Sequence, residues 1–124
     1  MVACAAGLAL MTLAVPRLTA GLIKINGDPV KRMMQRGVTP QPGELKRFIL
    51  NRHDAAAWSD DARIWMDVGM AYMKAATATS PPTESDRRSL AGAANAFDRA
   101  LALSPASGVA WLRLGEVRLR QAGP

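Results

Sequence analysis

Apolar and polar positions follow a helical period over most of the chain after residue 41. Between 42 and 57, Leu45, Phe48 and Ile49 stand at i, i+3 and i+4, so they share one face of a helix. No segment shows the strict two-residue alternation of β-branched residues that indicates a strand. The pattern therefore predicts an all-α fold, with helices over 42–57, 60–76, 84–103 and 107–121.

Residues suited to helix ends support two of these helices. Ser59 is expected to cap the helix over 60–76, with Asp60 and Asp61 in its first turn, where negative charge complements the helix dipole. Thr83 followed by Asp86 resembles a capping box with Asp in place of the usual Glu. These signals place helix starts near residues 60 and 84.

The connecting segments are expected to be less regular. Asp28 is a candidate cap for a short helix that begins at Pro29. Two prolines within 38–43 exclude a helix there and indicate an extended linker. The segment 77–83 is predicted to be a loop.

The N-terminal segment is apolar and long enough to interact with a membrane. Residues 1–15 carry no charge, Pro16 and Arg17 interrupt the run, and apolar residues continue to Ile23. Twenty-three helical residues extend about 35 Å, against a bilayer core of about 30 Å. A membrane anchor is the favoured interpretation; a cleaved signal peptide and a buried core helix are the alternatives. We expect a bacterial inner-membrane anchor with a periplasmic remainder, although the side is left open.

Two later segments share a motif. Trp65, Val68, Gly69 and Tyr72 have the same spacing as four residues of the last predicted helix, which are Trp111, Leu114, Gly115 and Arg118. Between the two segments stand four further residues at fixed spacing, which are Ala93, Phe97, Ala100 and Pro105. Together these positions resemble the tetratricopeptide repeat (TPR), with Arg118 departing from the tyrosine of the pattern.

The resemblance implies antiparallel helical hairpins. The two tryptophans are 46 residues apart, whereas the repeat period is about 34, so about 12 residues are inserted. Spacing on either side matches the pattern, which places the insertion between Tyr72 and Ala93. The chain then holds one complete repeat and the first helix of another. This divides it into an anchor or signal segment, an irregular linker with helices and a TPR-like region, over 1–24, 25–58 and 59–124.

Gly69 is unexpected in the middle of a helix, because an interior glycine costs about 1 kcal/mol relative to alanine. In a hairpin of this type, Gly69, Ala93 and Ala100 let two helices approach closely, while Trp65 and Phe97 fill the adjacent space. Gly69 is therefore expected to face the helix over 84–103.

Candidate partner-binding residues follow from the same resemblance, since one side of the first helix of each repeat lines a groove for peptides or proteins. These candidates are Met66, Met70, Met73, Lys74, Glu116 and Arg120. Methionine side chains adapt to varied partners, but packing of the three methionines against the preceding helix is an equal alternative. The last helix has no following helix to cover it, so self-association through it is a further alternative.

The composition mainly serves to exclude classes of function. The net charge is +6, but basic residues are spread along the chain beside acidic ones, so nucleic acid is not the expected partner. Cys4 is the only cysteine and His53 the only histidine, and His53 is expected to be solvated. The sequence contains no phosphate-binding loop, dinucleotide fingerprint or nucleophile elbow. We therefore expect no enzyme activity, no cofactor and no metal site.

The favoured hypothesis is a membrane-anchored, non-catalytic module that binds other proteins. By similarity of architecture it resembles accessory proteins of bacterial envelope or exopolysaccharide assembly, an analogy of fold alone. The alternatives are a basic surface that binds an anionic polymer or lipid headgroup, and a truncated remnant of a longer repeat protein.

Overall fold

The computed structural model describes residues 2–76 and 82–123, so part of the predicted 77–83 loop lies outside the described residues. The described residues form six helices and no strand, which confirms the all-α prediction. The helices are α1 (Val2–Ile25), α2 (Asp28–Gln35), α3 (Pro42–Trp58), α4 (Ala62–Ala75), α5 (Glu84–Leu103) and α6 (Gly108–Ala122).

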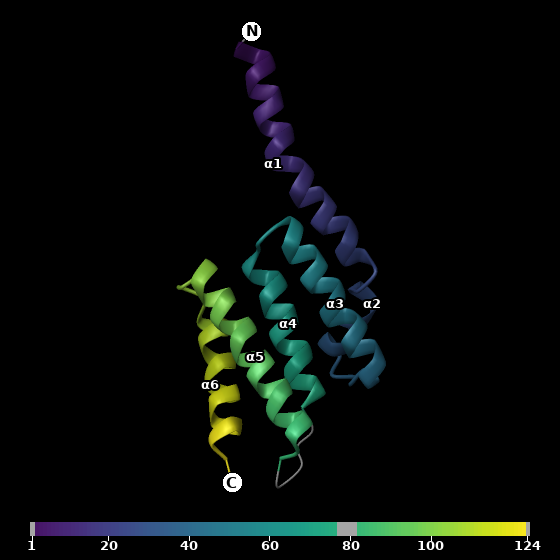
Figure 1. The fold of residues 1–124 in the computed structure, drawn as a ribbon, viewed down its shortest axis with the longest axis vertical. Helices are drawn as coiled ribbons and strands as arrows, with labels where there is room; N and C mark the ends of the chain where they lie inside the picture. The colour runs from purple at the N-terminus through teal and green to yellow at the C-terminus, as the bar shows by residue number, and fades with distance from the viewer. Residues whose placement is uncertain (1, 77–81, 124) are drawn as a thin grey trace.

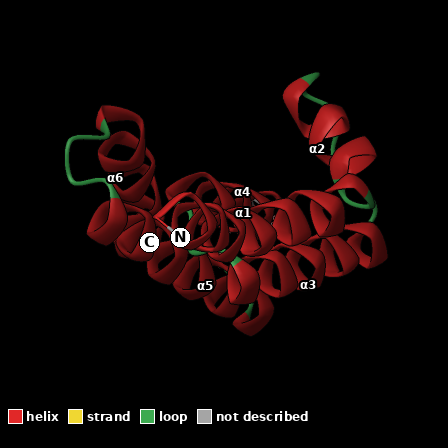
Figure 2. Cartoon of the chain, turned by 90° about the horizontal axis from the view of Figure 1, so that it is seen from above, coloured by secondary structure: helices red, strands yellow, loops and turns green. Residues whose placement is uncertain are grey.

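Helices α3 to α6 pack side by side in chain order, and each contacts the next (Figure 1). The last turns of α1 pack on α3, while the rest of α1 projects beyond the bundle. Viewed from above, α2 and α6 stand on the same side of the row formed by α3, α4 and α5 (Figure 2). Within this row, α4 lies between α3 and α5.

The core consists of small, aliphatic and aromatic side chains that join neighbouring helices. One cluster links α3, α4 and α5, and its buried members are Leu45, Phe48, Ile49, Trp65, Val68, Ala71, Ala96 and Ala100. A second links α5 with α6 and the end of α4, through Ala76, Leu90, Ala93, Ala94, Phe97 and Val117. Helix α3 therefore shares one core with the helices that follow it.

The helix ends differ from the sequence prediction in two places. The N-cap of α4 is Asp61, not Ser59, because the Asp61 carboxylate accepts the Arg63 backbone N–H. Asp60 instead accepts the indole N–H of Trp65 at 2.7 Å. Asp28 does not cap α2 but is its first residue, with Gly27 at the cap position. The Thr83–Asp86 capping box of α5 is confirmed, with both reciprocal bonds at 3.1 Å.

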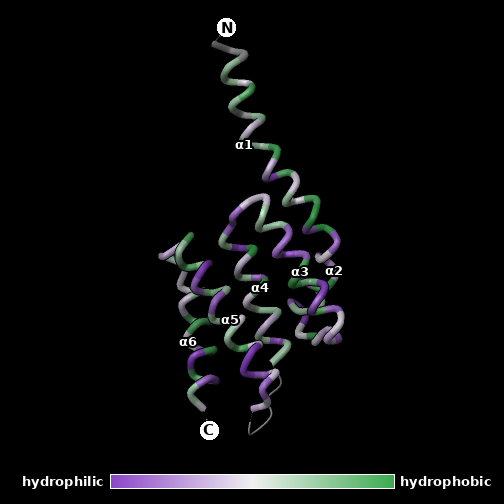
Figure 3. The backbone as a smooth tube through the Cα atoms, in the orientation of Figure 1, coloured by the Kyte–Doolittle hydropathy of each residue, from purple (hydrophilic) through white to green (hydrophobic). Residues whose placement is uncertain are grey.

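Helix α1 runs through Pro16 without a break. Most of α1 is coloured green or white in Figure 3, whereas the bundle helices mix green and purple. This contrast reflects a helix whose outward residues are apolar.

Candidate functional site

The three candidate methionines lie on α4 and are half-buried. Met70 and Met73 pack against the cluster formed by α5 and α6, and Met66 touches both core clusters. The alternative that they pack on the preceding helix is therefore wrong for Met70 and Met73, whose apolar contacts are with the following helices. Each methionine nevertheless keeps part of its surface accessible.

Arg120 and Glu116 of α6 are held by specific contacts. The guanidinium of Arg120 donates from α6 to the carbonyl oxygens of Met73 at 3.5 Å and Ala76 at 3.3 Å. These carbonyls belong to the C-terminal end of α4, where the helix dipole favours a cation. Glu116 pairs with Arg113 at 3.0 Å. Arg120 therefore ties α6 to α4.

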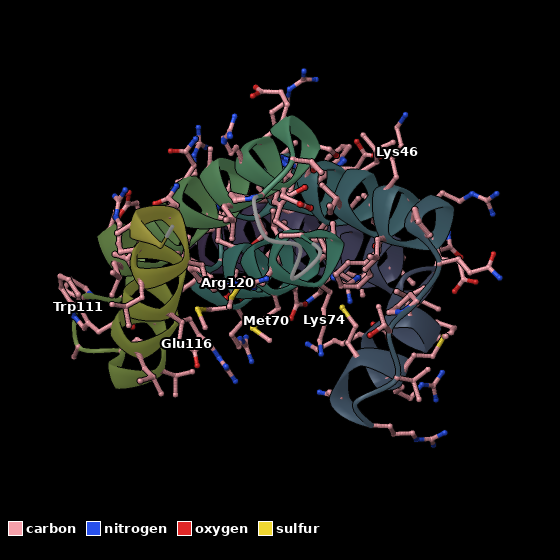
Figure 4. All side chains as sticks on the ribbon, turned by 90° about the horizontal axis from the view of Figure 1, so that it is seen from below. Lys46, Met70, Lys74, Trp111, Glu116 and Arg120 are labelled. Atoms are coloured by element: carbon pink, nitrogen blue, oxygen red, sulfur yellow. The ribbon has the colours of Figure 1, made fainter. Side chains whose placement is uncertain are left out.

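The predicted residues are brought to one side of the molecule. Figure 4 shows Met70, Lys74, Glu116 and Arg120 on the side where α6 flanks α4. Lys74 also lines a cavity of about 550 Å³ between the start of α3, the end of α4 and the start of α5. Lys46 lines the same cavity, but the two lysines extend to different sides of the view in Figure 4, so their ammonium groups do not converge.

One side of helix α6 is exposed, although the corresponding side of α4 is covered. Both helices bury one side against the preceding helices, through Ile64 and Ala71 on α4 and Ala110 and Val117 on α6. The opposite side of α4 packs on α5, and Trp65 there is only 7% exposed.

On α6 the matching side is open. Trp111 is 57% exposed and Leu119 is 75% exposed. A Cβ built on Gly69 would lie 2.5 Å from Cε1 of Phe97, whereas a Cβ on Gly115 would have no neighbour within 4 Å. We call the residues Leu112, Gly115 and Leu119 the open face of α6.

Sequence reasoning missed the most connected side chain of the fold, Arg52. It is fully buried in α3 and lies 4.5 Å over the ring of Phe48. Its guanidinium pairs with Asp67 of α4 and Asp28 of α2, both at 3.1 Å. It also donates to the carbonyl oxygen of Lys24 at the end of α1 at 2.9 Å. Four helices therefore meet at one cation.

A signal for Arg52 was present in the sequence. Arg52 follows Phe48 by four residues and Leu45 by seven, so it continues the apolar face of α3. A cation on a buried face requires a carboxylate partner, because an unpaired buried charge is strongly destabilising. Arg52 is buried, whereas the adjacent His53 is exposed.

The other titratable groups show local pairing. His53 is exposed, as predicted, and its ring stacks edge-on against Trp65 at 5.4 Å between centroids. Hydrogen bonding from the Arg63 guanidinium lowers the pKa of Asp61, and the same contact raises the pKa of Arg63. Within residues 2–76 and 82–123, no group of three histidine, cysteine or acidic side chains is placed to hold a metal ion.

One helix could cross a membrane by length and composition. Its apolar span covers Ala5–Ile25, and only 6% of the most apolar window is buried. A signal sequence and the core helix of a soluble protein, which is mostly buried, pass the same test of length and composition.

Comparison with protein-family models, with curated proteins and with solved structures finds no match to this chain.

Proposed function

We propose that the chain is a non-catalytic, membrane-anchored module that binds another protein through TPR-like helices. The observation that carries this proposal is the open face of α6. Helix α6 repeats the tryptophan–glycine spacing of α4, yet the side that α4 buries against α5 faces solvent on α6. A helical repeat unit buries its apolar face only when a neighbour covers it.

The packing of α4 on α5 indicates what kind of partner fits. Phe97 of α5 fills the space above Gly69, and Tyr72 of α4 lies against Gly92 of α5. A partner helix with an aromatic side chain above Gly115 would reproduce the first contact. Small residues around that aromatic side chain would let the backbones approach. The expected partner is therefore an amphipathic helix, which is one of the common modes of peptide recognition.

The partner's charge follows from α6 itself. Arg118 stands where the motif of α4 has Tyr72, and it is exposed, with a 3.7 Å contact to Asp98 and a 3.4 Å hydrogen bond to the side-chain oxygen of Gln121. Arg113 pairs with Glu116, and Arg120 donates to carbonyl oxygens of α4, which leaves the exposed Arg118 as the basic group of α6 that a partner would meet. A second copy of α6 would bring like charges together, which disfavours self-association. An acidic helix is the complementary partner.

Membrane attachment is supported by the exposure of α1. Six of its large apolar side chains are more than half exposed, which are Leu8, Met11, Val15, Leu18, Leu22 and Ile25. Soluble monomers rarely leave a continuous apolar surface of this kind uncovered. A bilayer around α1 would cover it.

Site-specific photo-crosslinking in native membranes tests the protein-binding function. A photoreactive amino acid at Leu119, on the open face, is expected to give one protein adduct. The same amino acid at Leu50, a position on α3 that is also more than half exposed, serves as the matched control. The adduct should persist in high salt, because contacts to a polyanion weaken steeply with salt whereas apolar contacts do not.

Gly115→Leu provides the second arm of this experiment. It fills the space that a partner's aromatic side chain would occupy, and its Cβ atom has no neighbour in the fold within 4 Å. Loss of the Leu119 adduct in this variant supports helix docking. An adduct that forms equally at Leu50, or that survives Gly115→Leu, contradicts the proposal. A covalent dimer of the chain would identify a second copy as the partner and exclude the acidic helix.

A further inference from the structure

The apolar span of α1 overlaps the part of α1 that the bundle holds. The span covers Ala5–Ile25. Ala20 within it is 3% exposed and packs with Ala55 and Ile64. The side-chain amide of Asn51 donates to the carbonyl oxygen of Ile23 at 2.6 Å. No linker therefore separates the apolar helix from the bundle.

Because of this overlap, a bilayer that surrounds the apolar span must lie close to the bundle. A helix needs about 20 residues to cross a hydrocarbon core of about 30 Å. Nearly the whole apolar span is then required, including the turns beside Ala20. The headgroup layer adds about 6 Å on each side of the core. The end of the bundle next to Ala20 must therefore lie within the headgroup layer.

The α3–α4 and α5–α6 turns both lie at this end, the one from which α1 projects (Figure 1). Apolar side chains are exposed around both turns. Trp58 ends α3 and is 53% exposed, and Leu103 ends α5 and is 44% exposed. Trp111 is held over the α5–α6 turn, because its indole N–H donates to the carbonyl oxygen of Pro105 at 2.9 Å.

The distribution of tryptophan points to a lipid interface. We call the end of the bundle from which α1 projects the anchor end. The chain has three tryptophans, and the two exposed ones, Trp58 and Trp111, both flank the turns at this end. The third, Trp65, is buried in the core. Tryptophan is enriched where bilayers meet water, because its ring is apolar and its N–H is polar.

We propose that the anchor end of the bundle is a second membrane-contact surface, on which Trp58 and Trp111 lie in the headgroup layer. This inference rests on the proposed anchoring by α1. Asp60 and Asp61 limit the depth of contact, since a carboxylate in hydrocarbon is costly. Contact at this surface fixes the bundle against the bilayer, so that the open face of α6 has a defined orientation.

Tryptophan quenching by brominated lipids tests the surface. The full chain is reconstituted in phosphatidylcholine vesicles with bromine near the headgroup end of the acyl chains, and emission is compared with that in unbrominated vesicles. We expect strong quenching of the wild type. The Trp58→Phe/Trp111→Phe variant should lose little emission, because its remaining Trp65 is buried.

The buried Trp65 is thus the internal control in every sample. Both substitutions are at exposed positions, and matching circular dichroism spectra check that the fold is retained. Flotation after a carbonate wash reports the anchor separately. A chain that floats but shows equal quenching in wild type and variant overturns the second contact and leaves the anchor intact. Failure to float overturns both proposals.

Discussion

At the scale of single residues, Gly69 and Gly115 hold the same position in the two motif segments, so their substitutions can be compared directly. We expect Gly69→Leu to lower the free energy of unfolding by about 1–3 kcal/mol through overpacking. Phe97 is fully buried and its ring lies where the new side chain would begin, so it cannot yield easily. Gly115→Leu should instead raise stability by up to about 1 kcal/mol, because it gains helix propensity without a clash.

Urea denaturation of both variants measures this difference. A Gly69→Leu protein as stable as Gly115→Leu would show that the close approach of α4 and α5 does not require glycine. The Gly69 contact could be predicted from the sequence, because the cost of an interior glycine demands a packing reason. The open surroundings of Gly115 have the same local sequence signal, and only the three-dimensional arrangement separates the two.

Arg52 is the second residue whose role is set by its surroundings. Arg52→Ala should lower the free energy of unfolding by about 3–5 kcal/mol, because a buried ion pair is broken. Arg52→Lys should recover only part of this loss, since a single ammonium cannot replace the planar fork that reaches Asp67 and Asp28 together.

Arg47→Ala, at an exposed position on the same helix, is the control and should change stability by no more than about 0.5 kcal/mol. Thermal and urea unfolding of the three variants measure these effects. Equal stability of the Arg52 and Arg47 alanine variants would mean that the four-helix junction does not contribute to folding.

At the scale of helices, the start of α4 gives a prediction that depends on pH. Asp61 caps α4, so Asp61→Ala should lower stability by about 1 kcal/mol at neutral pH, whereas Asp61→Asn keeps the cap. The folded pKa of Asp61 lies below its ordinary value of 3.8. Its ionic contribution is therefore fully present above pH 3.8 and is lost as the pH falls through the folded pKa.

Unfolding of wild type and Asp61→Asn between pH 7 and pH 2 tests the sign. The difference in stability between them should be constant above pH 4, shrink as the pH falls from there through the folded pKa, and be lost below it. A difference that grows on acidification would show that Arg63 does not stabilise the carboxylate. Added salt should reduce the difference at neutral pH, because the Arg63 side chain of this pair is 85% exposed.

Helix boundaries were predictable where one cap candidate stood alone, as with Thr83. At the start of α4, Ser59, Asp60 and Asp61 could all cap by residue type. Their roles were decided by Trp65, whose indole N–H engages Asp60 and leaves Asp61 to cap. The candidate site shows the same limit, because helix spacing identified the methionine side of α4 but not the helices it would meet.

At the scale of the whole molecule, α1 has two parts that meet near residue 20. The first is the projecting part of the proposed membrane anchor, and the second packs on the bundle. We expect a chain lacking residues 1–19 to fold with nearly unchanged stability, since most of the helix that it loses projects beyond the bundle (Figure 1) and the buried Ala20 is kept. Removal of residues 1–27 should lower stability by several kcal/mol. Asn51 and Arg52 then lose the carbonyl oxygens of Ile23 and Lys24, and a buried donor without an acceptor costs about 1–3 kcal/mol. Thermal unfolding followed by circular dichroism compares the two. Equal melting temperatures would show that the whole of α1 is dispensable to the bundle. They would also contradict the rigid coupling that places the anchor end against the bilayer.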